Sequence, residues 1–360
     1  MAKIIHAADL HLDSAFVALT GEKAIERRAH QRIILQKIVE LGNEEDVDII
    51  LLAGDLFDSK NAYYETARMM ADALSKSRAE IFISPGNHDP YNEQAPYRAV
   101  TFSKNVHVFR KEKIEAYPLP QLGCTVYGAG FTAQSCDKEL LSGFKTTEEC
   151  GIMVLHGEVT ESASHYNPVR ECDIAESGLT YLALGHVHAH SGIQHAGETA
   201  YAYSGAPEGR GFDETGVKGV LIGTVSAGAV ELKLKKISPY SYTERIIKIE
   251  NNVLESILAQ IPEKSQYEVC RIILTGECER ANAEELLAVL SPRFYALRIA
   301  DRTHPHEDIW SYMGEDSIKG MFLRRLNEQL KAAEDDEVRA RIRLAAEFGV
   351  AAIDNREDVR

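Results

Sequence analysis

Cysteine, tryptophan and long hydrophobic runs are scarce in this 360-residue chain, and basic residues are outnumbered by acidic ones. The six cysteines are scattered, and no two have the CxxC spacing of a zinc knuckle or a redox centre. We therefore expect buried thiols in a reducing compartment rather than disulfide bonds. The longest apolar runs, such as residues 49–53, have the length of a strand and fall far short of the roughly 20 residues that a membrane helix needs.

The first ten residues, MAKIIHAADL, also lack the charged region, the long apolar region and the cleavage site of a signal peptide. These absences together predict a cytoplasmic protein without a membrane segment. The net charge of −15 argues against a protein that binds nucleic acid through an overall positive charge. Bound divalent cations or a basic partner subunit can offset such acidity locally.

Short β-branched runs alternate with amphipathic helical stretches in the first half of the chain, which predicts a layered α/β domain. These stretches cover residues 4–8, 24–43, 48–53, 65–76 and 80–84. Between residues 113 and 236 strands dominate, and turns that contain glycine separate them. We expect this part to form a second, largely antiparallel sheet that faces the first across a core.

A different organisation begins after the segment ISPYSY at residues 237–242, which has the character of a linker. The pattern is strand, helix, strand, helix, strand, at residues 244–249, 253–260, 268–274, 283–290 and 295–299. It predicts a small α+β domain of about 60 residues. Apolar residues then recur at helical spacing within charged sequence, which predicts two amphipathic helices. The expected divisions are 1–237, 243–303 and 304–360.

Five short motifs carry potential metal ligands, and each follows a predicted strand. They are Asp9-Leu10-His11, Gly54-Asp55-Leu56-Phe57-Asp58, Gly86-Asn87-His88-Asp89, Leu155-His156-Gly157-Glu158 and Gly185-His186-Val187-His188. Loops at the carboxyl ends of strands in open α/β sheets converge on one crevice, so the five motifs can share a site. Carboxylate, imidazole and amide donors without a thiolate favour manganese, iron or zinc.

The five motifs together resemble those of the calcineurin-like metallophosphoesterases; in this chain they read DLHLDS, AGDLFDS, PGNHDPY, LHGE and GHVH. Two longer stretches resemble the SbcD/YhaO exonucleases and Mre nucleases, namely HAADLHLDS and YSGAPEGRGFDETGVKG. The resemblance covers residues 1 to about 205 for the five motifs. It implies a four-layer α/β/β/α sandwich, followed by a small α+β capping domain and C-terminal helices. One such motif alone is usually incidental turn chemistry, and it is the ordered set that carries the interpretation.

Carried over to this sequence, the resemblance implies two divalent metal ions, which Asp55 bridges. The first ion is expected between Asp9, His11, Asp55 and His188, and the second between Asp55, Asn87, His156 and His186. His88 is then the catalytic side chain near the phosphate, and Asp89 orients it. Asp58 stands where some Mre nucleases carry a histidine, which leaves open whether there is a second catalytic histidine.

The implied activity is manganese-dependent DNA hydrolysis, 3′ to 5′ on duplex ends and endonucleolytic on single strands. The implied partners are DNA, an SbcC/YhaN-like ATPase that docks on the C-terminal helices, and a second copy of the chain. Packing of those helices on their own chain is an equal alternative. Arg210 can contact a DNA phosphate through its guanidinium. An ion pair of Arg210 with Asp213 or Glu214 inside a turn is the competing interpretation.

Two other functions fit the same motifs. A phosphodiesterase or phosphatase for nucleotides or other small phosphoesters can use an identical site, and the acidic charge favours it. A scaffold that regulates an ATPase without catalysis is disfavoured because all expected ligands and His88 are present.

Overall fold

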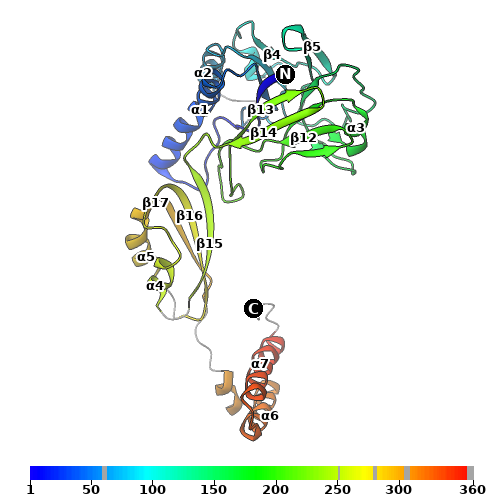
Figure 1. Ribbon diagram of the computed structural model, residues 1–360. Coiled ribbons are helices and arrows are strands. Elements are labelled where there is room, and N and C mark those ends of the chain that lie inside the picture. The colour runs from blue at the N-terminus through cyan, green and yellow to red at the C-terminus, as the bar shows by residue number, and fades with distance from the viewer. Residues whose placement is uncertain (59–62, 250–251, 279–281, 304–308, 355–360) are drawn as a thin grey trace. The chain divides into compact units, whose positions relative to one another are not determined.

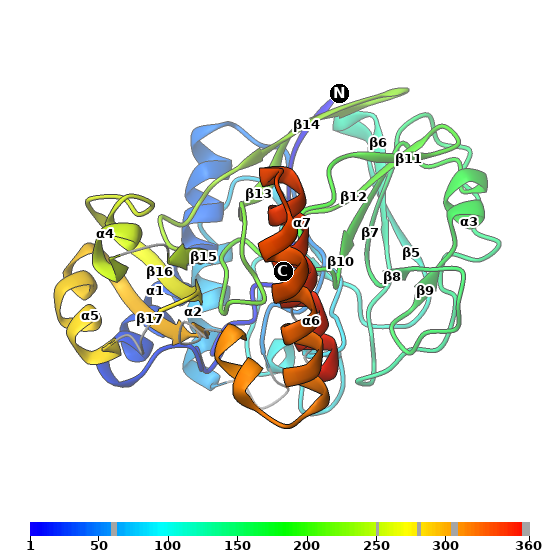
Figure 2. The same cartoon turned by 90° about the horizontal axis from the view of Figure 1, so that it is seen from below.

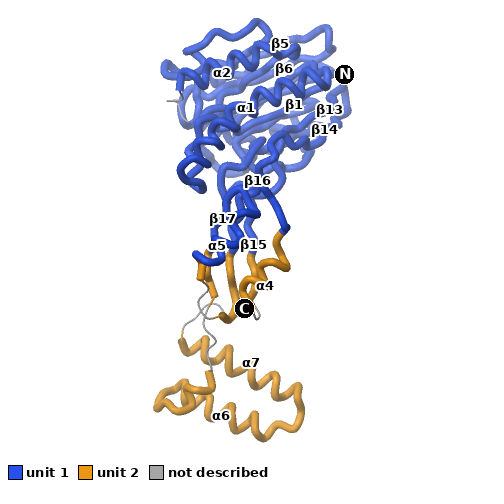
Figure 3. The backbone as a smooth tube through the Cα atoms, turned by 90° about the vertical axis from the view of Figure 1, so that its left-hand side faces the viewer, with its two compact units in different colours: residues 1–245, 262–272, 284–299 blue, residues 246–261, 273–283, 300–360 orange. Residues whose placement is uncertain are grey.

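The structure of the chain, a computed structural model, describes residues 1–58, 63–249, 252–278, 282–303 and 309–354 (Figure 1). The chain folds into two compact units (Figure 3). The first consists of Met1–Arg245, Pro262–Ile272 and Glu284–Ile299, and the second of Ile246–Ile261, Ile273–Ala283 and Ala300–Arg360.

The first sheet of the larger unit has a parallel centre and an antiparallel edge. Its order is β14 (Ala229–Lys235), β13 (Val220–Ser226), β1 (Ala2–Ala7), β2 (Ile49–Leu52), β3 (Glu80–Ile83) and β4 (Val106–Val108). Strands β1 to β4 are parallel, whereas β13 pairs antiparallel with β1 and with β14. The IILL sequence of β2 is apolar at every position because both faces of this central strand are buried.

The second sheet also has a parallel centre, which corrects the expectation of a largely antiparallel one. Its order is β11 (Gln194–Ala196), β12 (Thr199–Tyr203), β10 (Tyr181–Gly185), β7 (Gly151–His156), β6 (Cys124–Gly128) and β5 (Glu115–Leu119). Only the edge pairs β11 with β12 and β5 with β6 are antiparallel. The glycine turns do not all close hairpins, since long crossovers link β6 to β7 and β7 to β10.

Two helices cover the outer face of the first sheet. Leu35 and Ile38 of α1 (Gly21–Glu44) and Met70 of α2 (Tyr64–Leu74) share a core with Ile50 of β2. A second core joins the two sheets, and a third lies outside the second sheet, where Ile174 of α3 (Glu171–Glu176) packs. Figures 1 and 2 show α1 and α3 on opposite sides of the sheets. The layers therefore follow the predicted α/β/β/α order.

A third sheet has the order β15 (Ser241–Ile249), β16 (Ser265–Gly276) and β17 (Phe294–Asp301). With α4 (Val253–Leu258) and α5 (Ala283–Leu290), these strands reproduce the predicted succession of elements. Residues of the sheet are shared between the two compact units, and the predicted boundaries 1–237, 243–303 and 304–360 stay predictions. The remaining short elements are β8 (Glu158–Val159), β9 (Pro168–Val169) and the 3₁₀ turns η1 (Pro96–Arg98), η2 (Pro120–Leu122) and η3 (Ser291–Arg293).

The chain after residue 308 contains the 3₁₀ turn η4 (Ile309–Gly314) and helices α6 (Ile318–Ala332) and α7 (Asp336–Ile353). Two amphipathic helices were predicted here, and Leu323, Ala346 and Val350 form their common core. Residues 304–308 and 355–360 of the predicted 304–360 segment lie outside the described residues. In the described part of the chain, no helix combines the length and the apolar character needed to cross a membrane.

Candidate metal centre

The five motifs meet at one edge of the two facing sheets, because the strands that precede them are parallel. Asp9 follows β1, Asp55 follows β2 and Asn87 follows β3, while His156 ends β7 and His186 follows β10. Backbone hydrogen bonds tie the first two loops together. The amide of Asp9 donates to the carbonyl of Gly54 at 3.0 Å, and the amide of His11 donates to the carbonyl of Asp55 at 2.9 Å.

Four of the expected ligands have a backbone conformation that side chains other than glycine rarely adopt. The φ angles are 54° for Asp9, 45° for His11, 49° for Asp55 and 105° for His186. Such residues cost roughly 1–3 kcal/mol each and concentrate at functional sites. Gly54 is required beside them, since its φ is 85° and a Cβ there would fall on the ring of His156.

His11 and His188 face each other through their Nε2 atoms, which are 3.2 Å apart. The other nitrogen of each ring is already engaged: Nδ1 of His11 lies 3.1 Å from Oδ1 of Asp58, and Nδ1 of His188 lies 2.8 Å from Oε1 of Glu214. Because a carboxylate only accepts, each Nδ1 carries the proton and each Nε2 presents a lone pair. Two lone pairs that point at each other repel, unless a cation lies between them.

The same arrangement occurs around His156, which is buried. Its Nδ1–H donates to the carbonyl of Ala53 at 3.0 Å, so its Nε2 carries a lone pair. This Nε2 lies 2.9 Å from Oδ1 of Asn87 and 3.4 Å from Oδ2 of Asp55. Three acceptor atoms thus converge without a proton to share, which fits a second cation.

Charge in the site leads to the same conclusion. Burial, followed by the proximity of Asp55, raises the pKa of Asp9 well above its usual value. Burial also opposes ionisation of Asp55, but His156, His11 and His88 outweigh it and lower the pKa of that carboxyl. Burial lowers the pKa of His11 to about 4. His11 is therefore neutral near pH 7, and Asp9 and Asp55 can ionise together only if positive charge is supplied from elsewhere.

The structure brings the expected ligands together. The donor atoms of Asp9, His11 and His188 lie within 4.8 Å of one another, as do those of Asp9, Asp55 and His156. The first group contains three of the four ligands predicted for the first ion. The second contains Asp55 and His156, which were predicted for the second ion, together with Asp9.

His186 joins the site through its backbone and its ring. Its amide donates to Oδ1 of Asp9 at 3.1 Å, and its ring centroid is 5.3 Å from that of His156. Burial lowers the pKa of His186 to about 4. The half-exposed ring of Tyr166 covers it, with 4.7 Å between centroids.

His88 is exposed at the rim of the site. Its Nδ1 donates to the carbonyl of Asp58 at 2.9 Å, and its amide donates to Oδ1 of Asp55 at the same distance. The ring packs edge-on against His11, with 4.7 Å between centroids. Its Nε2 is therefore free to meet a substrate.

Asp89 has a role that differs from the expected one. Its buried carboxylate accepts from the amides of Leu56 at 2.7 Å and Gly86 at 2.8 Å, and from the hydroxyl of Tyr97. The carbonyl of Asp58, rather than Asp89, orients the ring of His88. Asp89 instead fastens the second and third motif loops to each other, so it acts on the site through the backbone.

Arg210 forms the ion pair that was one of its two interpretations. Its guanidinium pairs with Glu214 and also lies 3.4 Å from Oδ1 of Asp58 and 3.1 Å from Nδ1 of His188. Its side chain is only 15 % exposed, so most of its hydrogen-bonding capacity is used inside the protein.

Several supporting residues were missed at the sequence level. Glu214 holds His188, and Lys218 donates to the carbonyl of His188 at 2.6 Å. Gln31 of α1 donates to the carbonyl of His11 at 2.8 Å. None of these residues lies in the five motifs. Only Glu214 could be singled out from the sequence, as a possible ion-pair partner of Arg210. His190, the fourth residue after His186, bonds to the carbonyl of Tyr203 and belongs to none of the metal-binding groups.

Comparison with known proteins agrees with this geometry. The family described as calcineurin-like phosphoesterase matches residues 2–190, more than half of the chain. The chain is 25% identical over 334 residues to an uncharacterized metallophosphoesterase, YhaO, from Bacillus subtilis (strain 168), covering 83% of this chain and 81% of that protein. It is 23% identical over 369 residues to the DNA double-strand break repair protein Mre11 of Saccharolobus solfataricus, covering 93% and 92%.

Among solved structures, the chain matches "GAP50 the anchor in the inner membrane complex of Plasmodium" with a TM-score of 0.37 and 12% identity, over 66% of this chain and 89% of that one. This similarity is too low to carry an argument. The family match spans all five motif loops and the parallel strands that position them. The chain therefore belongs to the calcineurin-like phosphoesterase family, and within that family it is similar to proteins of the SbcD/YhaO, Mre-type group.

Proposed function

We propose that this protein is a two-metal, manganese-dependent DNA nuclease that works in DNA repair with an SbcC/YhaN-like ATPase. Membership of the family makes it a phosphoester hydrolase that uses divalent metal ions. The observation that carries the nuclease proposal is the paired set of converging lone pairs, at His11 with His188 and at His156 with Asn87. Two adjacent cation sites of this kind suit phosphodiester cleavage. The near-complete coverage of a relative named for double-strand break repair supports DNA as the substrate.

The chain's own residues have distinct tasks in this reaction. When bound, the two cations supply an activated water and hold the scissile phosphate. Asp58 and Glu214 keep the protons of His11 and His188 on Nδ1, so that Nε2 stays available as a ligand. His88, fixed through its Nδ1–H, presents Nε2 to the phosphate, and in its imidazolium form, with a proton also on Nε2, it stabilises developing charge or gives that proton to the leaving 3′-oxygen. We propose 3′ to 5′ exonuclease action on duplex ends and endonuclease action on single strands.

Manganese is the metal that we propose, with iron or zinc as alternatives. The donors in the described site are carboxylate oxygens, imidazole nitrogens and an amide oxygen, and no thiolate is among them. Such a set suits borderline divalent ions.

The C-terminal helices are the proposed ATPase-docking segment. Helices α6 and α7 bury Leu323 and Val350 between them but leave Met321, Leu344 and Phe348 exposed. A contiguous exposed apolar patch is typical of a surface that a partner covers, and we propose that these side chains belong to one. A homodimer and a cytoplasmic location complete the proposal.

A phosphodiesterase for small phosphoesters is the second candidate, and the net charge of −15 favours it. An acidic protein attracts a DNA backbone weakly, whereas a small ester meets only the metal site.

The test is degradation of end-labelled duplex DNA by the purified full-length protein with Mn²⁺, beside the small ester bis(p-nitrophenyl) phosphate. We expect DNA shortening, and a fall in kcat of roughly 10²–10⁴-fold in His88→Ala. The matched control is His195→Ala, because His195 is exposed on β11 outside the motifs. Turnover of the ester without DNA cleavage, including in the presence of the ATPase, would replace the nuclease with the second candidate.

A further inference from the structure

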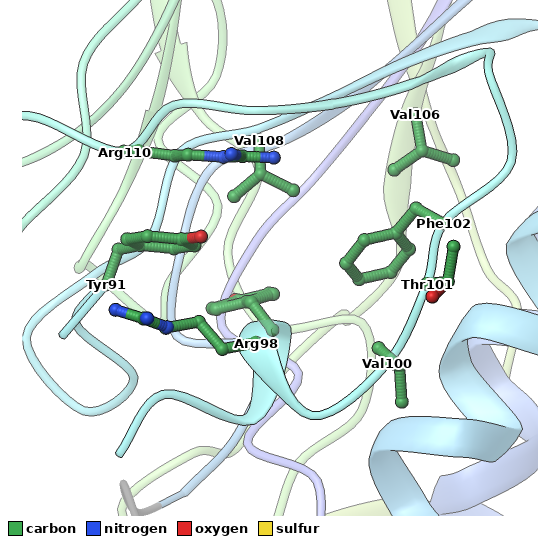
Figure 4. Close-up of a pocket in the computed structure, with 9 residues that line it drawn as sticks. Tyr91, Arg98, Val100, Thr101, Phe102, Val106, Val108 and Arg110 are labelled. Carbon is green, nitrogen blue, oxygen red and sulfur yellow. The ribbon is translucent and has the colours of Figure 1, made fainter. Parts of the chain in front are cut away.

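A cavity of ≈360 Å³ lies beside the catalytic loops and is used by none of the steps above (Figure 4). It is formed by the segment that follows the GNHD motif, by the turn η1 and by strand β4 with the residues next to it. The volume is within the range of small-molecule sites, roughly 300–1,000 Å³.

Two arginines give this pocket its charge. Arg98 and Arg110 are exposed, and within the described ranges neither guanidinium forms an ion pair with a carboxylate. The guanidinium carbon of Arg110 lies 5.5 Å from the ring centroid of Tyr91, and Figure 4 shows that ring between the two arginine side chains. Each guanidinium, on its own side of that ring, has donors that match the oxygens of a phosphate.

Apart from Thr101, the other residues that line the pocket are apolar or aromatic. Phe102, Val100 and Val106 form the side that faces the two arginines across the cavity in Figure 4, and Val108 lies between. Phe102, Val100 and Val106 are only half-buried, so they have apolar surface that a ligand can cover. A flat ring packs well on such a surface. The pocket thus combines an anion-binding side with a ring-binding side.

We propose that this pocket binds a nucleotide carrying a phosphomonoester, with its phosphate on the arginine side of the pocket and its base against Phe102. The ligand is either a free nucleoside monophosphate or the phosphorylated terminal nucleotide of a strand. The site is separate from the metal centre and does not depend on the proposed nuclease activity.

Its position links it to the catalytic loops. Tyr97 lines the pocket, and its hydroxyl donates to Asp89. Asp89 in turn holds the amides of Leu56 and Gly86, which flank the predicted ligands Asp55 and Asn87. A ligand in the pocket therefore contacts the side chain that anchors both loops.

The experiment is calorimetric titration of the full-length protein with dAMP, once with Mn²⁺ and once with excess EDTA. Binding that depends on the metal centre disappears in EDTA, so the component that persists reports the pocket. We expect this component to weaken roughly tenfold or more in Arg98→Gln and in Arg110→Gln, because each removes a charge-assisted hydrogen bond to phosphate. His88→Ala, and Arg343→Gln on an exposed position of α7, leave it unchanged.

A second titration, with a 5′-phosphorylated oligonucleotide, separates the two sources of the nucleotide. Tighter binding of dAMP assigns the pocket to the free nucleotide, and tighter binding of the oligonucleotide assigns it to a strand end; both uphold the proposal. Three results overturn it: no binding of either ligand in EDTA, binding that the two arginine variants do not change, or inorganic phosphate binding as tightly as dAMP. Circular dichroism of each variant distinguishes loss of the site from loss of the fold.

Discussion

Replacing Glu214 with glutamine tests how the protein prepares His188 for a metal ion. Glu214 is buried, and its Oε1 lies 2.8 Å from Nδ1 of His188. Burial opposes ionisation of this carboxyl, but His188 and Arg210 outweigh it and bring its pKa well below the usual range. Glu214 is therefore a carboxylate at neutral pH, and it makes the Nε2 atom of His188 a better electron donor.

The size of the effect follows from the bond that changes. A glutamine in the same place can still accept the Nδ1–H through its amide oxygen, but without charge. A hydrogen bond to a charged group contributes about 1.5–3 kcal/mol and a neutral one about 0.5–1.5 kcal/mol. The difference of about 1–2 kcal/mol corresponds to roughly 5–30-fold in metal affinity. The substitution also removes the negative charge that neutralises Arg210, whose guanidinium lies 3.1 Å from Nδ1 of His188. The positive charge of Arg210 then opposes metal binding at His188, which lowers the metal affinity further.

The assay is isothermal titration of the metal-free, full-length protein with Mn²⁺ at pH 7.5. We expect the affinity of one of two binding steps to fall in Glu214→Gln, while Asp213→Asn, an exposed neighbour in the same loop, behaves as the wild type. Equal affinities for the wild type and Glu214→Gln, with both proteins folded, would refute the reasoning that the partner of Nδ1 tunes His188.

Three further predictions concern stability and catalysis. Tyr97→Phe removes a buried hydroxyl that donates to Asp89, so the free energy of unfolding measured in urea should fall by about 1–3 kcal/mol. Tyr91→Phe is the control. Equal unfolding free energies for the wild type and Tyr97→Phe would contradict a stabilising hydrogen bond from Tyr97 to Asp89. Burial lowers the pKa of His6 to about 3, so the unfolded chain binds one more proton between about pH 6.5 and pH 3. The unfolding free energy should fall as the pH decreases through that window, and more steeply in the wild type than in His6→Gln; parallel curves would argue against a neutral buried His6. His88→Ala should lose activity but keep its Mn²⁺ affinity, and a loss of affinity would make His88 a ligand.

The strand and loop positions of the motifs were predictable from the sequence, because the signal is local. Asp9 and Asp55 each come directly after an apolar run, and such runs form the buried central strands β1 and β2. Parallel neighbours then bring the loops to one edge. The direction of the strands in the second sheet was not predictable in the same way. A turn with glycine, such as that at Gly178, fits a hairpin and a crossover equally well, and pairing decides between them.

The role of Asp89 shows a second limit. Adjacency to His88 suggested that Asp89 orients the histidine ring. In the folded chain the carboxylate of Asp89 instead points to amides at Leu56 and Gly86. A buried carboxylate needs several donors, and the free amides of two tight loops supply more of them than one imidazole does.

The orientation of the ligands depends on contacts that cross the chain. His11 is fixed by Asp58, His156 by the carbonyl of Ala53, and His188 by Glu214. These partners are 47, 103 and 26 residues away from the histidines they hold, so no local pattern links them. A motif names the donor residues, but the partner of the other ring nitrogen decides which atom carries the lone pair. The sequence of this protein therefore predicts which residues gather at the metal centre, and only its fold shows why their Nε2 atoms all face inward.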